Sequence, residues 1–174
     1  MTKKYETIKL SRRHLIATTA AFAAAPGVGL AATPRVVTWD DLIPPGVPYA
    51  EIIGEGEMDP VQDTWLPEFD ENATKLNDAL DGAYIKMPGY VLPIDMSTAG
   101  VTSFIMVPYV GACIHVPPPP ANQLVFVDSE KPWPGTQLWD PVWVTGRMKH
   151  ELQSTTIADI GYALTADKIE AYEW

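Results

Sequence analysis

A cysteine and a histidine two residues apart are the side chains of this sequence best suited to chemistry. Cys113 and His115 lie in a run, Cys113–Val116, whose composition predicts a β-strand. In a strand, the side chains of residues i and i+2 point to the same face, and their Cα atoms lie about 6.6–7 Å apart. A thiolate and an imidazole at this spacing could therefore bind one metal ion. Zinc accepts both groups, with bond lengths of about 2.3 and 2.0–2.1 Å. The pair therefore indicates part of a metal site.

Two ligands do not complete a zinc site, so a third or fourth must come from elsewhere. The candidates are Asp95, His150 and a carboxylate from the N-terminal part of the chain. Two other interpretations stay open. A free cysteine is among the most buried residue types, and the pair could be structural. Cys113 could also be a nucleophile whose pKa is lowered by His115, although no third catalytic group or oxyanion-hole loop is recognisable.

The residues around the pair predict a binding edge. Four prolines, Pro117–Pro120, stiffen the chain as a polyproline stretch that lacks backbone donors. Tyr109 precedes the pair, and Asn122 and Gln123 follow the prolines, so these three side chains are the candidates for the edge. All lie in a stretch of 32 residues, Met96–Val127, without Asp, Glu, Lys or Arg. Its glycines and prolines exclude a transmembrane helix, which leaves buried central strands or a contact surface.

The elements that must position these residues are mainly β. From Ala83 onward, short β-rich runs are separated by glycine and proline, and six strands are predicted: Ala83–Pro93, Val101–Tyr109, Cys113–Val116, Leu124–Val127, Pro141–His150 and Tyr162–Tyr172. Six short strands in residues 83–174 predict a small OB-like β-barrel, closed or partly open, with a β-sandwich as the alternative. Gly89 and Gly146 would let the strands coil sharply.

Residues 33–82 have a different texture, rich in prolines, acids and isolated aromatic residues. They show no sustained periodicity, which predicts an irregular extended arm that wraps on the barrel. One or two short helices are expected in it, one of them near Asn72–Leu80 and ended by Gly82. Because 142 residues suit a single core, we expect the arm and the barrel to form one domain, residues 33–174.

Residues 1–32 predict a cleavable export signal. A basic start leads to the pair Arg12-Arg13, a mildly apolar stretch follows over Leu15–Ala25, and small residues allow cleavage after Ala31 or Ala32. The stretch is well short of the roughly 20 apolar residues that span a bilayer. We therefore expect export by the twin-arginine pathway, periplasmic localisation, and no transmembrane segment after cleavage.

Charge limits the classes of partner. The whole chain has a formal net charge of −10, and without its first 32 residues it keeps seven basic and 21 acidic residues, a net charge of −14. Nucleic acid requires a basic footprint, which is absent, so nucleic-acid binding is excluded. The negative electric field of the chain favours the binding of cations, and the same net charge keeps an exported protein soluble.

Several motifs resemble a known family of bacterial exported proteins, the domain-of-unknown-function family 3299, over most of Trp39–Tyr172. The matching runs are Pro88–Pro93, Pro108–Gln123, Val142–Arg147 and Gly161–Tyr162. The resemblance implies a periplasmic protein or lipoprotein, often encoded beside a MacB-like ABC transporter and a periplasmic zinc-binding protein. The central motif of the family falls on these residues: Cys113, His115, Asn122 and Gln123. This chain departs from the family in its twin-arginine start, and it has neither a lipobox cysteine nor a His-rich tract.

The resemblance and the cysteine–histidine pair together predict a non-enzymatic accessory protein of the periplasm. It would bind a transition metal, zinc above all, through Cys113 and His115, and work with an ABC-type transport or efflux system. Its expected partners are the periplasmic face of such a transporter or a periplasmic metal-binding protein. The alternatives are a protein-interaction module that holds no metal and a thiol-dependent enzyme.

Overall fold

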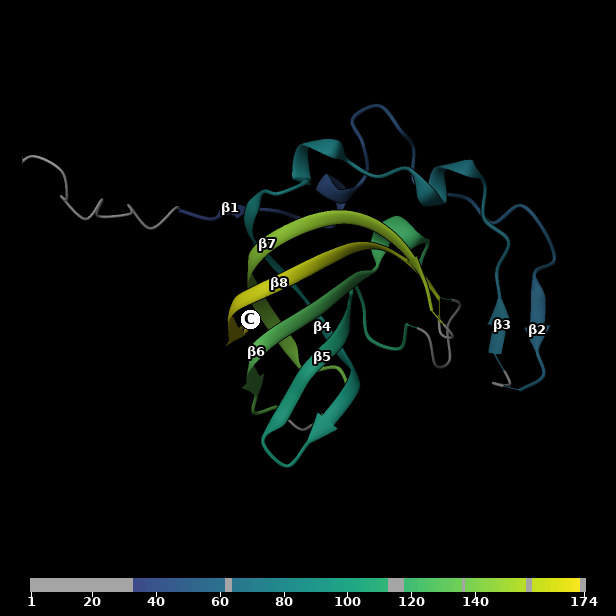
Figure 1. Cartoon of the computed structure of the whole chain (residues 1–174). Helices are drawn as coiled ribbons and strands as arrows, with labels where there is room; N and C mark the ends of the chain where they lie inside the picture. The colour runs from purple at the N-terminus through teal and green to yellow at the C-terminus, as the bar shows by residue number, and fades with distance from the viewer. Residues whose placement is uncertain (1–32, 62–63, 113–117, 136, 156–157, 173–174) are drawn as a thin grey trace, which may run out of the picture. The chain divides into compact units, whose positions relative to one another are not determined.

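A computed structural model describes residues 33–61, 64–112, 118–135, 137–155 and 158–172. The chain divides into two units, residues 1–32 and 33–174, and all that follows concerns the second. Five long strands dominate it (Figure 1): β4 (Tyr84–Ser97), β5 (Gly100–Val107), β6 (Val125–Trp133), β7 (Pro141–Ser154) and β8 (Asp159–Ala171). The prediction of a mainly β chain is confirmed.

The five strands close into a barrel. The sheet order is β4-β5-β6-β8-β7, and β7 pairs again with β4, so that each barrel strand has two neighbours. Every pairing is antiparallel except that of β6 with β8, which is parallel. The β4–β7 ladder runs from Tyr84↔Arg147 to Tyr90↔Pro141 and closes the barrel. This arrangement confirms the OB-like barrel and leaves no place for the β-sandwich.

Alternation along β4 shows how the sequence fills the barrel. Ile85, Met87 and Val91 point inward and are buried, whereas the residues between them are partly exposed. Gly89 holds an inward position that has no room for a side chain, because a Cβ atom there would collide with Met106 and lie 2.9 Å from the indole of Trp39. A period of two residues thus buries one face of the strand, and the glycine admits its larger neighbours.

The uncharged stretch supplies much of the core. In β5 the run Phe104–Val107 is fully buried, and Leu124 and Val125 are also buried. Because β5 lies between β4 and β6, both of its edges are paired and one of its faces lines the barrel. Burial of central strands therefore accounts for the described part of Met96–Val127, apart from exposed positions such as Tyr109.

The short helix predicted near Asn72–Leu80 is present as 3-10 turns and not as one continuous helix. The structure has two 3-10 turns there, η2 (Glu71–Thr74) and η3 (Asp78–Leu80), separated by extended backbone. The Asp70 side chain accepts a hydrogen bond from the backbone N–H of Asn72, and the Asn77 side chain accepts one from Ala79. Such local bonds compete with a continuous helix. Two more 3-10 turns are η1 (Asp40–Leu42) and η4 (Ala121–Gln123).

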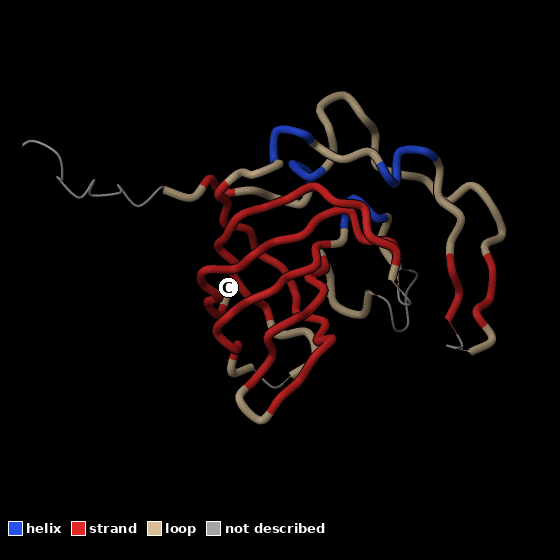
Figure 2. The backbone as a smooth tube through the Cα atoms, in the orientation of Figure 1, coloured by secondary structure: helices blue, strands red, loops and turns tan. Residues whose placement is uncertain are grey.

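The arm also contains three short strands that the sequence did not predict. β1 (Arg35–Val36) adds to the barrel sheet beside β4 in parallel. β2 (Glu57–Asp59) and β3 (Thr64–Leu66) form a separate antiparallel pair. Figure 2 shows this pair standing away from the barrel strands, joined to them through the loops and turns of the arm. We call residues 51–70 the arm hairpin.

Candidate functional site

The predicted metal ligands Cys113 and His115, and the predicted strand that carries them, lie outside the described residues. The residues on either side are described. Ala112 is fully buried and packs with Ile105 and Leu124, and Pro119 is also buried. The prediction of a metal site at Cys113 and His115 therefore remains a prediction, with both flanks of the segment packed on the barrel.

The two proposed further ligands lie far from each other. Asp95 follows the end of the β4–β7 ladder at Tyr90, whereas His150 follows its other end at Arg147. The Nδ1 atom of His150 lies 3.2 Å from a carboxylate oxygen of Asp78. One ion cannot bind both Asp95 and His150, and the described part of the chain contains no cluster of three histidine, cysteine or acidic side chains.

The predicted binding edge divides into an exposed and a buried part. Tyr109 is partly exposed, but Asn122 and Gln123 are buried. The Asn122 side-chain amide donates to the carbonyl oxygens of Asn72 (2.8 Å) and Lys75 (3.2 Å). The Gln123 amide donates to Trp39 O at 3.0 Å. Both side chains therefore bind the arm, and only Tyr109 presents the surface that a recognition edge requires.

Tyr162 is a third anchor of the arm, and sequence reasoning gave it no role. Its hydroxyl accepts a hydrogen bond from Asn77 N (2.6 Å) and donates one to Leu42 O (2.5 Å). The ring is fully buried, and burial raises the pKa of Tyr162 to about 12. Asn77 in turn donates through its side chain to Asp41 O at 2.8 Å. One phenol thus joins two segments of the arm to the barrel.

A cleft of about 400 Å³, the loop cleft, opens where the base of the arm hairpin meets the segment before η4 and the β7–β8 connection. Its lining includes Leu66, Phe69, Asp70, Pro118, Thr155 and Asp159. No lysine, arginine or histidine is among the described lining residues, so the two carboxylates give the cleft a negative field. Asp70 already accepts two hydrogen bonds from Asn72, which leaves Asp159 as the more available carboxylate.

A second cleft, of about 190 Å³, is lined by aromatic and proline side chains around Gly89. We call it the aromatic cleft, and its walls are Trp39, Tyr90, Tyr172, Pro88, Pro108 and Pro141. Tyr172 stacks on Trp143 with ring centroids 5.2 Å apart, and the Lys86 ammonium lies 5.1 Å from the Trp143 ring. The outward positions of β4 that flank Gly89 were the available signal for this surface, which the sequence analysis did not identify.

Among the described residues, no helix has both the length and the apolar character needed to cross a membrane.

Comparison with known proteins gives a family and a fold. A search of the curated proteins finds no match. The crystal structure of a DUF3299 family protein from Pseudomonas aeruginosa PAO1 is similar to this chain, with 38% sequence identity and a TM-score of 0.66. The similarity covers 82% of this chain and 99% of that one. The family described as "Protein of unknown function (DUF3299)" matches residues 39–171, and the chain therefore belongs to the DUF3299 family.

Proposed function

We propose that this protein is a non-enzymatic accessory protein of the periplasm that binds a transition metal, zinc above all, and works with an ABC-type transport system. Cys113 and His115 would supply the first two ligands. Thiolate and imidazole are ligands that zinc prefers, and their spacing suits a shared ion if the segment is extended. The twin-arginine signal read in residues 1–32 supports the periplasmic location.

The loop cleft is the observation that carries the proposal. Pro118 and Pro119 line the cleft and directly follow the segment of Cys113 and His115 in the chain. The described lining offers carboxylates and hydroxyls without a cationic side chain, which is the electrostatic setting that a divalent cation favours. Asp159 is the described carboxylate that we assign as the third ligand, in place of Asp95 or His150.

Zinc titration of the purified protein tests the proposal. We expect one equivalent of zinc to bind, with affinity at least about tenfold lower after Cys113→Ala, His115→Ala or Asp159→Asn. The matched controls are Asp95→Asn and His150→Ala, which should bind zinc like the unchanged protein. The metal proposal would be contradicted if the unchanged protein bound no zinc in the titration, or if the Cys113→Ala protein bound zinc as tightly as the unchanged protein.

A second function is favoured by the aromatic cleft. In this alternative the protein is an interaction module that needs no metal. Tyr90 and Tyr172 of the cleft contact a partner, together with Tyr109, which follows the cleft residue Pro108 in the chain. Aromatic walls with prolines between them suit an extended, proline-containing segment. Tyr90→Ala should then abolish partner binding and leave zinc binding unchanged. The metal proposal instead predicts that Tyr90→Ala changes neither partner binding nor zinc binding.

A further inference from the structure

The arm hairpin has regular secondary structure, which hydrogen bonds stabilise. Ile53 N donates to Glu68 O and Asp70 N donates to Glu51 O, both at 2.9 Å. Further along, Met58 pairs with Trp65 in the β2–β3 ladder. The Trp65 indole N–H donates to Glu55 O at 2.8 Å. The described part of the hairpin therefore has a defined conformation.

Apolar side chains of the hairpin face solvent. Ile53 is 63% exposed and Met58 is 61% exposed, and Ile52, Val61 and Leu66 are exposed as well. An isolated two-stranded ribbon is marginally stable in water, so exposed apolar residues do not help it to fold alone. Exposed apolar side chains on a projecting element are typical of a contact surface.

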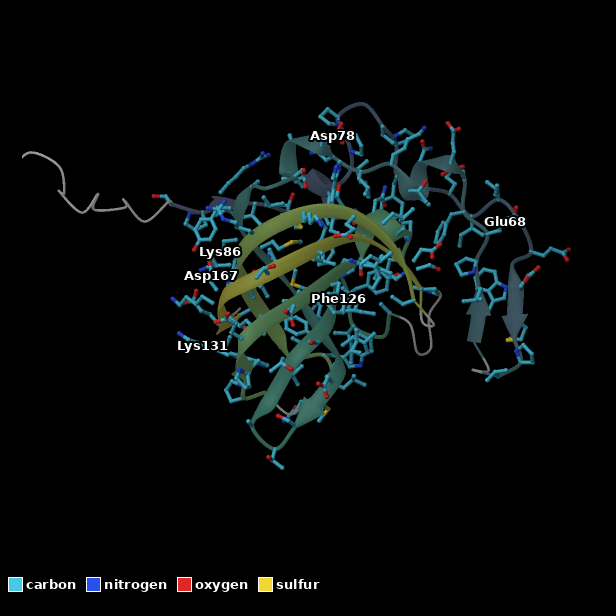
Figure 3. All side chains as sticks on the ribbon, in the orientation of Figure 1. Glu68, Asp78, Lys86, Phe126, Lys131 and Asp167 are labelled. Atoms are coloured by element: carbon cyan, nitrogen blue, oxygen red, sulfur yellow. The ribbon has the colours of Figure 1, made fainter. Side chains whose placement is uncertain are left out.

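The charge around these apolar residues has a single sign. Residues 51–70 contain seven acidic residues and no lysine, arginine or histidine. The absence of basic residues extends from Val36 to Thr74, which includes ten acids. Figure 3 shows Glu68 on the hairpin side of the molecule and the labelled lysines, Lys86 and Lys131, on the barrel at the other side of the view.

We propose that the described part of the arm hairpin is a docking surface for a partner protein whose contact face carries both basic and apolar residues. Charge complementarity selects this occupant, because a segment with seven acidic residues and no basic one attracts a basic face and repels an acidic one. A second copy of the chain would bring its own acidic hairpin and a net charge of −14 outside residues 1–32. An anionic lipid surface is repelled for the same reason.

The ribbon also offers edges to a partner strand. Within the described residues, β2 and β3 pair with each other and with no other strand. Unpaired strand edges accept a further strand by main-chain hydrogen bonds, and the side chains then add specificity. A basic, apolar strand of the partner fits both the edges and the charge. The inference does not depend on metal binding.

Binding of a model strand to the purified protein tests the proposal. The probe is a peptide of alternating lysine and valine, and the peptide control has alternating lysine and serine. Met58→Asp and Ile53→Asp each remove an apolar side chain and add negative charge, whereas Leu152→Asp makes the same change at a 51% exposed position of β7. A surface that works by charge alone would bind the peptide more tightly after all three changes.

We expect the two hairpin variants to bind the lysine–valine peptide about tenfold more weakly and Leu152→Asp to bind it within about twofold of the unchanged protein. The lysine–serine peptide should bind at least about tenfold more weakly than the lysine–valine peptide. Circular dichroism confirms that each variant is folded. Equal binding of both peptides, or tighter binding by Met58→Asp, overturns the proposal. Two further results would identify another occupant and overturn the proposal. One is a dimer that dissociates in the Met58→Asp variant, and the other is binding to zwitterionic vesicles that the same substitution abolishes.

Discussion

Two parts of the same arm meet the barrel in different ways. The segments around Leu42 and Asn77 are hydrogen-bonded to the buried hydroxyl of Tyr162. The backbone carbonyls of Trp39 and Asn72 accept hydrogen bonds from the side chains of Gln123 and Asn122. The arm hairpin has exposed apolar residues and a pure negative charge. Buried polar side chains thus anchor one part of the arm to the barrel. The other part, the arm hairpin, presents exposed apolar side chains to a partner.

The largest effect should follow from Tyr162→Phe. The change leaves Asn77 N–H and Leu42 C=O without their buried partner, and each such loss costs about 1–3 kcal/mol. We expect the free energy of unfolding in urea to fall by about 2–6 kcal/mol. Tyr84→Phe, at a partly exposed position of β4, is the control. Equal stability of the two variants would show that the phenol is no anchor.

High pH should reproduce part of this loss without a mutation. Burial raises the pKa of Tyr162 from 10.0 to about 12, so the neutral phenol is favoured in the folded state. Its stabilising contribution is fully present below pH 10 and is lost as the pH rises to about 12, a change of about 2–3 kcal/mol. The stability difference between the unchanged protein and Tyr162→Phe should therefore narrow over this range. Parallel stability curves would disprove the assignment.

A smaller effect is expected from Gln123→Ala. Its amide donates to Trp39 O across 84 residues of sequence, so the substitution should lower the free energy of unfolding by about 1–2 kcal/mol. Gln137→Ala is a matched control, because Gln137 is exposed. Its effect should stay within about 0.5 kcal/mol. If both changes were neutral, the hydrogen bond from Gln123 to Trp39 would not help to hold the arm.

The smallest change in stability should come from Met58→Asp in the arm hairpin. The side chain is 61% exposed, so its replacement should alter the free energy of unfolding by no more than about 0.5 kcal/mol. Thermal and urea unfolding measure this value. A loss comparable with that of Gln123→Ala would mean that the hairpin helps to hold the fold, which removes the contrast between the two parts of the arm.

The barrel could be predicted from the sequence because its strands carry local signals. Alternation of apolar residues and breaks at glycine and proline located all five barrel strands, although β4, β6 and β7 extend several residues beyond their predicted ends. The strand order could not be predicted. The parallel pairing of Val125 with Tyr162 joins residues far apart in sequence, and nothing in either strand alone encodes it.

The arm and the site depended on tertiary contacts that no local pattern shows. Asn122 and Gln123 are polar and follow a proline run, which favours a surface position. They are buried because their side-chain amides donate to carbonyl groups of the arm, those of Asn72 and Trp39 among them. β2 and β3 escaped prediction because each has only three residues and the sequence around them is acidic and glycine-containing.

Hydrogen exchange with and without the lysine–valine peptide tests the division of the arm most directly. The account predicts slow exchange at the amides of Asn77 and Leu80 under both conditions, and fast exchange at Met58 and Leu66 that becomes slow when the peptide binds. Slow exchange of the hairpin amides without the peptide, or protection confined to the anchors, would contradict the claim that one part of the arm holds the fold and the other binds a partner.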